Sequence, residues 1–252
     1  DFNDTTTNQA LGYDASVSSP ALNNKGGFDA ITYSGNGGTQ TIKGLAFQPD
    51  LVWLKARDQS YTHILVDSVR GKTKEIYSNG TTAEQTTTNT VTSLNSDGFS
   101  LGNRANTNQN NASYIAWAWK AGGTASANTD GSITSQVSAS NEYGFSVVSY
   151  TGNGTNGATV GHGLNSKPKW FIIKERGNTN DWTVYHESLG STGGGDTYVL
   201  FLNLTNDRGG GFAGGYNNTA PTSSVFSLGN SNETNRSSGN YIAYCWAEIE
   251  GF

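Results

Sequence analysis

The stretch that decides the fold is GFSVVSYTGNG, residues 144–154, because nearly the same phrase, GFDAITYSGNG, occurs at residues 27–37. The period-two pattern of a β-strand places Phe145 and Val147 on one face and Val148 on the other. The Gly-Asn-Gly ending predicts a tight turn, because glycine and asparagine both tolerate positive φ angles. Two distant copies of one strand and turn indicate an internal duplication.

The match between the two copies continues in the same order toward the end of the chain. In each copy a proline precedes an apolar run that ends in Lys-x-Arg, and later segments repeat FSLG and YIA. The corresponding segments are QPDLVWLKAR (48–57) and KPKWFIIKER (167–176), YTHILVDS (61–68) and WTVYHES (182–188), DGFSLG (97–102) and SVFSLG (224–229), and YIAWAW (114–119) and YIAYCW (241–246). The second pair aligns Tyr61 with Trp182.

The duplication divides the 252 residues into four parts. The first repeat is predicted to span residues 27–123 and the second residues 144–252. Residues 1–26 match nothing downstream and are predicted to be an N-terminal arm. Residues 124–143 are rich in Ala, Ser, Thr and Gly, a composition typical of a linker, with room for one short strand.

The pattern within each repeat predicts strands and turns and almost no helix. LVWLK and WFIIK are apolar runs next to proline and charge, as expected for strands that are buried on both faces. Turn signals such as SGNGG, NSDG and NETN recur along both repeats. We therefore predict an all-β protein with two tandem antiparallel β-sandwich repeats of a jelly-roll-like kind.

Composition narrows the class of protein. Lys and Arg number 15 against 20 Asp and Glu, so the net charge of −5 argues against a nucleic-acid or membrane-surface partner, which would need a basic patch. Only 14% of residues are charged and 34% are hydrophobic, so the surface is predicted to be polar but uncharged. A single cysteine excludes an intramolecular disulfide framework.

Several rare phrases resemble a repeat of unknown function that is found in structural proteins of marine tailed phages. These phrases are GFDAITYSGNG (27–37), YIAWAWKAGG (114–123), GFSVVSYTGN (144–153), NNTAPTSSVFSLG (217–229) and YIAYCWAEIEGF (241–252). The resemblance covers nearly all of the chain from residue 26 onward. It implies a tail-fibre or virion-surface protein, and it carries over no catalytic residue.

The sequence gives little indication of a metal site. The three histidines, His63, His162 and His186, lack the close spacing of a metal-ligand set, and the simpler interpretation of each is a polar residue at a strand edge. NSDG (95–98) and NTDG (128–131) lack the alternating acids of a calcium loop and are interpreted as tight turns. We predict no metal and no cofactor.

The sequence gives equally little indication of a catalytic site. Cys245 corresponds to Ala118 in the first repeat, which indicates a packing position and not a reactive thiol. Glu248 and Glu250 would project from one face of a strand as the two acids of a glycosidase do, but their repeat-1 counterpart includes Lys120. We predict no catalytic residue. The remaining acids Asp58, Asp67, Glu175 and Glu187 are predicted to pair with Arg57, Arg70, Lys174 and Arg176.

Aromatic residues provide the one candidate binding surface. Tryptophan and tyrosine in strands more often pack in a core than bind sugars. Three of them, Tyr61, Trp182 and Tyr216, lie next to predicted loops and form our candidate glycan platform.

The leading functional hypothesis is a non-enzymatic virion structural module, displayed on the particle surface as part of a tail fibre, head fibre or capsid decoration protein. Its predicted partners are other virion proteins and further copies of itself, without nucleic acid or membrane. One alternative is a lectin-like module that recognises host-surface glycans. A second alternative is a polysaccharide-degrading enzyme of sandwich fold.

Overall fold

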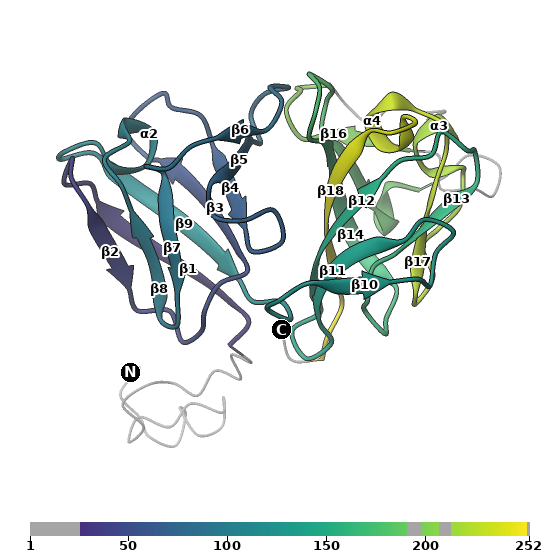
Figure 1. Ribbon diagram of the computed structural model, residues 1–252, viewed down its shortest axis with the longest axis horizontal. Helices are drawn as coiled ribbons and strands as arrows, with labels where there is room; N and C mark the ends of the chain where they lie inside the picture. The colour runs from purple at the N-terminus through teal and green to yellow at the C-terminus, as the bar shows by residue number, and fades with distance from the viewer. Residues whose placement is uncertain (1–25, 191–197, 207–212, 251–252) are drawn as a thin grey trace, which may run out of the picture.

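The computed structural model describes residues 26–190, 198–206 and 213–250. Within them the chain forms two β-sandwiches that lie side by side (Figure 1). The all-β, antiparallel sandwich fold predicted from the sequence is confirmed. The predicted N-terminal arm lies outside the described residues except for Gly26.

The first repeat is a sandwich of a six-stranded and a three-stranded sheet, with strand orders β1-β9-β3-β4-β5-β6 and β2-β8-β7. A short helix, α2 (Ala105–Asn108), precedes β9. The strands are β1 (Phe28–Ser34), β2 (Gln40–Lys43), β3 (Leu51–Ala56), β4 (Ile64–Asp67), β5 (Lys74–Tyr77), β6 (Gln85–Thr86), β7 (Val91–Asn95), β8 (Gly98–Leu101) and β9 (Ser113–Trp119).

The second repeat has a seven-stranded and a two-stranded sheet, with strand orders β10-β11-β12-β18-β14-β15-β16 and β13-β17. Its short helices are η1 (Glu187–Leu189), α3 (Ala213–Tyr216) and α4 (Asn232–Asn235). The strands are β10 (Ser126–Asn128), β11 (Ser135–Ser140), β12 (Phe145–Thr151), β13 (Ala158–Gly161), β14 (Pro168–Glu175), β15 (Thr183–His186), β16 (Leu200–Phe201), β17 (Val225–Leu228) and β18 (Asn240–Ala247).

The two repeats share one topology. The order β1-β9-β3-β4-β5 in the first repeat recurs as β12-β18-β14-β15-β16 in the second, and β2-β8 recurs as β13-β17. The register agrees as well, because Trp119 lies opposite Phe28 and Trp246 lies opposite Phe145. The duplication inferred from the sequence is therefore a duplication of the fold.

The repeated glycine turn is held by a buried asparagine at the end of a short helix. Asn108 accepts the backbone N–H of Asn36 at 2.9 Å, and Asn235 accepts that of Asn153 at 2.9 Å. Both asparagine side chains belong to fully buried residues. A Cβ atom on Gly35 would lie 2.2 Å from a backbone oxygen just after α2. Only glycine fits this approach, which explains the repeated phrase.

The segment 124–143, predicted to be a linker, differs from expectation because it contains two strands. Strand β11 pairs with β12 from Ser135 opposite Tyr150 to Ser140 opposite Phe145, and β10 pairs with β11. Unpaired backbone groups at the edge of β12 favour such an addition, whatever the side chains. In the first repeat, no strand of the described residues covers the corresponding edge of β1.

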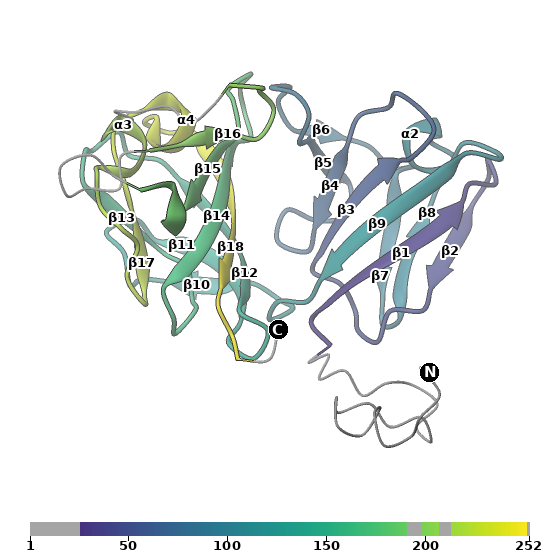
Figure 2. The ribbon, with the colours of Figure 1, turned by 180° about the vertical axis from the view of Figure 1, so that it is seen from behind.

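The two large sheets pack against each other, so the described residues form four layers, with three large apolar clusters and a small fourth one around Tyr114. Figures 1 and 2 both show β12, β14 and β18 facing β3, β4 and β9. One cluster fills each sandwich. The third lies between the sandwiches, and we call this contact the seam. Its buried members are Leu51, Leu65, Ile76, Ala121, Phe145, Val147, Ile172, Trp182, Val184, Ile242 and Tyr244.

Candidate functional site

The three residues of the predicted glycan platform do not form one surface. Trp182 is 0% exposed and lies in the seam, and Tyr216 is 1% exposed and lies in the core of the second sandwich. Tyr61 is half-buried in the first repeat, where its hydroxyl donates to Gln109. Buried rings cannot stack on a sugar, so the predicted platform is wrong for Trp182 and Tyr216.

Trp182 joins the two repeats. Its indole Nε1 donates to the backbone oxygen of Tyr77 in the first repeat at 2.8 Å. Its ring stacks on that of Tyr244 at a centroid distance of 6.5 Å. A tryptophan on the outer face of an isolated sandwich would be exposed, but here the other repeat covers it.

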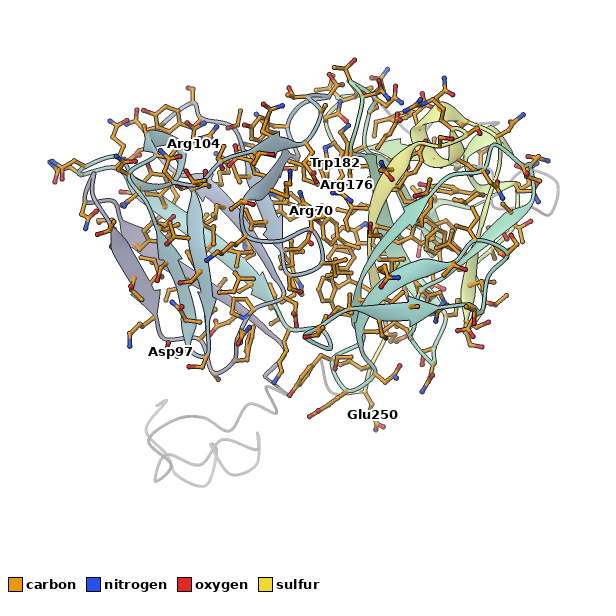
Figure 3. The ribbon with its side chains drawn as sticks, in the orientation of Figure 1. Arg70, Asp97, Arg104, Arg176, Trp182 and Glu250 are labelled. Atoms are coloured by element: carbon orange, nitrogen blue, oxygen red, sulfur yellow. The ribbon has the colours of Figure 1, made fainter. Side chains whose placement is uncertain are left out.

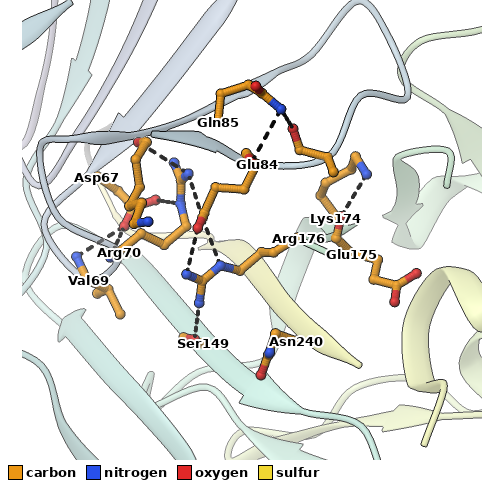
Figure 4. A network of polar contacts seen from close by, with 12 residues as sticks. Asp67, Val69, Arg70, Glu84, Gln85, Ser149, Lys174, Glu175, Arg176 and Asn240 are labelled. Atoms are coloured by element: carbon orange, nitrogen blue, oxygen red, sulfur yellow. Dashed lines mark hydrogen bonds and ion pairs between the residues drawn. The ribbon is translucent and has the colours of Figure 1, made fainter. Parts of the chain in front are cut away.

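The seam also contains a buried polar network (Figures 3 and 4). Arg70 Nε donates to Asp67 Oδ2 at 2.5 Å, and both side chains are fully buried. Tyr244, from the second repeat, donates its hydroxyl to the same Asp67 oxygen at 2.7 Å and accepts from Arg70 Nη2 at 3.2 Å. Burial raises the pKa of Tyr244 well above its ordinary value, so its hydroxyl stays neutral and remains a donor. The pairing of Asp67 with Arg70 confirms the sequence-based prediction.

A second part of the network crosses the seam through Glu84 and Arg176. Arg176 Nε and Nη2 donate to the two carboxylate oxygens of Glu84 at 2.8 and 3.0 Å. The Glu84 backbone N–H donates to the Arg176 backbone oxygen at 2.7 Å. Burial acts to raise the pKa of Glu84, but the bonds and charges of Arg176 and Arg70 lower it overall. Figure 3 shows Arg70, Arg176 and Trp182 between the two sandwiches.

The other predicted ion pairs have different partners. Glu175 is buried and pairs with Arg236, and Glu187 pairs with Lys169 at 2.7 Å. Asp58 accepts the backbone N–H of Ser113 at 2.9 Å. These partners lie far away in the sequence or on neighbouring strands, which residue spacing alone does not reveal.

None of the histidines lies in a metal-ligand set. His162 is fully buried, and its Nδ1 accepts the backbone N–H of Leu164 at 3.1 Å while Nε2 lies 3.2 Å from the Thr222 oxygen. Burial lowers the pKa of His162 to about 4, which keeps it neutral. In the described part of the chain, no three His, Cys, Asp or Glu side chains come together as a group that could hold a metal ion.

Cys245 and the two C-terminal glutamates show no arrangement for catalysis. Burial raises the pKa of the Cys245 thiol to about 12, so the nucleophilic thiolate is disfavoured. Strand β18 ends at Ala247, so Glu248 and Glu250 follow the strand and do not share its face. The Glu248 side chain is 76% exposed and lies 3.5 Å from Lys169. The expected placement of these two acids on one strand face is therefore wrong.

The two sequences considered as calcium loops each begin at the last residue of a strand. Gly98, the last residue of NSDG, begins β8 with a φ of 154°, and a Cβ there would lie 1.9 Å from the Ile42 oxygen. In NTDG, Asn128 Oδ1 accepts the backbone N–H of Asp130 at 3.0 Å. The interpretation as a tight turn is confirmed for NSDG, whereas NTDG begins a longer loop between β10 and β11.

A pocket of about 270 Å³ opens where the two repeats meet. Among the described residues its lining has no lysine, arginine, aspartate or glutamate, and burial and the nearby charge of Lys55 lower the pKa of its histidine, His63. The lining residues are Trp53, His63, Ser78, Asn79, Leu202, Asn203, Leu204 and Thr205. Two other hollows, of about 310 and 420 Å³, are lined without an aromatic side chain.

The pocket is built from equivalent positions of the two repeats. Leu54 lies opposite Ile64 and Ile173 opposite Thr183, so the preceding residues, His63 and Trp182, correspond to each other. This register corrects the sequence alignment, which placed Tyr61 against Trp182 with an error of two residues.

Two asparagines support the same correspondence. Asn79 Oδ1 accepts the backbone N–H of His63 at 2.9 Å, and Asn203 Oδ1 accepts that of Trp182 at 2.9 Å. Neither asparagine was predicted, although IYSN (76–79) and LFLN (200–203) repeat one pattern that indicates their equivalence.

Helices of the described residues are all too short or too polar to cross a membrane. Comparison with curated proteins and with solved structures gives no match. One family model matches: it is described as a domain of unknown function (DUF7483), and the match covers residues 25–252, through both repeats. The chain therefore belongs to the DUF7483 family.

Proposed function

We propose that the chain is a non-enzymatic structural module of a tailed-phage particle, displayed on the particle surface as part of a tail fibre, head fibre or capsid decoration protein. Its partners in this proposal are other virion proteins and further copies of the same chain. The family-level resemblance described above motivates the setting, and the physical arrangement of the repeats supports the structural role.

The observation that carries the proposal is the seam. Trp182, Ile242 and Tyr244 are fully buried between the repeats, and the Asp67–Arg70 pair is buried beside them. Domains that move independently usually meet through smaller and more polar interfaces. A buried apolar and ionic contact makes the two sandwiches one rigid unit, as a load-transmitting or spacing element requires.

Surface chemistry fits the same role. With 14% charged residues, the chain relies on Asn, Thr, Ser and Gly for its polar surface. Salt screens charges within about 10 Å at 0.1 M and within less in sea water, so an uncharged polar surface retains its behaviour there. Stability without disulfides suits assembly in a reducing cytoplasm.

The enzyme alternative has less support. A glycosidase needs two carboxyl groups about 5–10 Å apart that flank a bound sugar. Glu248 and Glu250 follow the end of β18, and neither lines any of the three hollows described above. Two of the three residues predicted for the lectin alternative, Trp182 and Tyr216, are buried and cannot bind a sugar. The pocket between the repeats is a different candidate for a sugar-binding site.

The test is to count the chain in purified particles by quantitative mass spectrometry and to locate it by cryo-electron microscopy. A non-structural protein from the same genome serves as the control for contamination. The proposal predicts a fixed copy number per particle, related to the symmetry of the place where the chain sits. Absence from washed particles, or polysaccharide cleavage by the purified chain, would contradict it.

A further inference from the structure

The seam pocket exists because the two repeats differ at one equivalent position. In the second repeat that position is Trp182, which is 0% exposed and fills its side of the seam. In the first repeat it is His63, which is smaller and half-buried. His63 lines the pocket together with the ring of Trp53, and we infer that an indole at this position would fill much of the pocket.

Trp53 is a fixed platform on the pocket wall. Its Nε1 donates to Ser78 Oγ at 3.0 Å, and its ring packs edge-on against Trp117 at a centroid distance of 6.1 Å. The ring is half-buried, so part of its surface remains accessible. Leu204, which is 42% exposed, adds an apolar surface on the second repeat.

Unused polar groups surround this ring. Among the described residues, the imidazole nitrogens of His63 and the side-chain NH₂ of Asn79 have no hydrogen-bond partner; the Asn79 oxygen is used by the His63 N–H. Asn203, in contrast, is bonded at both ends of its amide, because its oxygen accepts from Trp182 and its NH₂ donates to Asp181 at 2.7 Å. A neutral imidazole offers one donor and one acceptor, which is what a pair of neighbouring hydroxyl groups requires.

We propose that the seam pocket binds one ring of a neutral hexopyranose, with the apolar face of the sugar on Trp53 and its hydroxyl groups bonded to His63 and Asn79. The volume of about 270 Å³ fits a single small ring and no larger ligand. Among the described residues no lysine or arginine lines the pocket, so an acidic sugar would lose hydration without gaining a direct ion pair there. The site is independent of where the chain is located in a particle and so goes beyond the structural role.

The test follows the ring signals of the three histidines by NMR while the full chain is titrated with methyl glucoside, methyl mannoside, methyl galactoside and N-acetylglucosamine. Glucuronate is the charged comparison. A ligand of this size in a shallow pocket should bind with a dissociation constant on the order of 1 mM. At least one neutral sugar should shift the His63 signal and leave those of His162 and His186 in place, and glucuronate should bind at least about tenfold more weakly.

Two variants separate binding from folding. His63→Trp restores the residue of the second repeat, fills the pocket and should abolish the titration shift seen at other pocket signals. His186→Trp places the same ring at an exposed histidine that does not line the pocket and should leave binding unchanged. If His63→Trp fails to fold, His63→Leu, which removes both ring nitrogens, serves in its place and should weaken binding at least about threefold. No shift of His63 with any neutral sugar at roughly a hundred times the expected constant, or undiminished binding in His63→Trp, would overturn the proposal.

Discussion

The two repeats have the same strand order, the same glycine turn and the same pair of supporting asparagines, yet they differ where they meet. At one equivalent position the second repeat has Trp182 and the first has His63. Trp182 is buried and reaches across to the Tyr77 backbone, whereas His63 borders a pocket. The duplicated fold thus keeps its internal supports and differs at a position where the two repeats meet, because each side of the contact has a different environment.

The largest expected effect comes from removing the tryptophan of this pair. Trp182→Ala leaves a cavity in the seam and should lower the free energy of unfolding by about 4–5 kcal/mol. His63→Ala, at the equivalent position, removes few contacts and should cost less than about 1 kcal/mol. Urea denaturation of both variants measures the difference. Equal losses would show that the two positions play the same part.

The second largest effect concerns the buried Asp67–Arg70 ion pair, in which both residues belong to the first repeat. Arg70→Met leaves Asp67 buried without its cation and should cost about 3–4 kcal/mol. Arg57→Met, at an exposed arginine of the same repeat, is the matched control and should change stability by no more than about 0.5 kcal/mol. A similar loss of unfolding free energy in the Arg57→Met control would show that burial in the seam does not make Arg70 more important than an exposed arginine.

One source of acid sensitivity is a buried histidine of the second repeat. His162 has a pKa of about 4 in the folded state against 6.5 as the ordinary value, so only the unfolded chain binds its proton between these values. Its stabilising contribution is complete above pH 6.5 and is lost as the pH falls toward 4, by about 3 kcal/mol in total.

His162→Gln should remove this part of the dependence of unfolding free energy on pH. The first repeat has Gly44 at the equivalent position and has no counterpart to this effect. The half-buried His63, whose pKa is also lowered, is the control, and His63→Gln should change the slope less. An unaltered slope in His162→Gln between pH 4.5 and 6.5 would refute the assignment.

The smallest expected effect is that of the partly exposed pair across the seam. A double-mutant cycle with Glu84→Gln and Arg176→Met should give a coupling energy of about 1 kcal/mol, reduced by salt. The corresponding cycle for the Lys43–Asp97 pair, which is 3.4 Å apart and largely exposed, should give less. A larger coupling in the exposed pair would mean that the seam does not strengthen its ionic contacts.

Much of each repeat follows from the sequence. The alternation in FSVVSY and the apolar runs before Lys-x-Arg predict strands, and the structure places β12, β3 and β14 there. The glycine turn was predicted, but its buried partner was not, because Asn108 and Asn235 follow their turns by more than seventy residues. The local residue pattern predicts each strand, but it does not predict which distant residues contact that strand.

The candidate site was harder to predict, for a physical reason. Period-two alternation tells which residues share a face but not what that face meets. Trp182 has the pattern of an outward-facing aromatic, and only the docking of the first repeat buries it. In the same way, 135–140 reads as linker by composition, and the free edge of β12 makes it a strand. In both cases a neighbouring sheet or strand, and not the side-chain pattern of the segment itself, decides the structure.

The central claim is that the seam makes two sandwiches into one unit. Scanning calorimetry of the full chain tests it most directly, by comparing the calorimetric enthalpy of unfolding with the van't Hoff enthalpy. The account predicts a single transition with a ratio of about 1, which splits or broadens in Trp182→Ala. Two separate transitions in the unaltered chain, each with the enthalpy of one repeat, would contradict it.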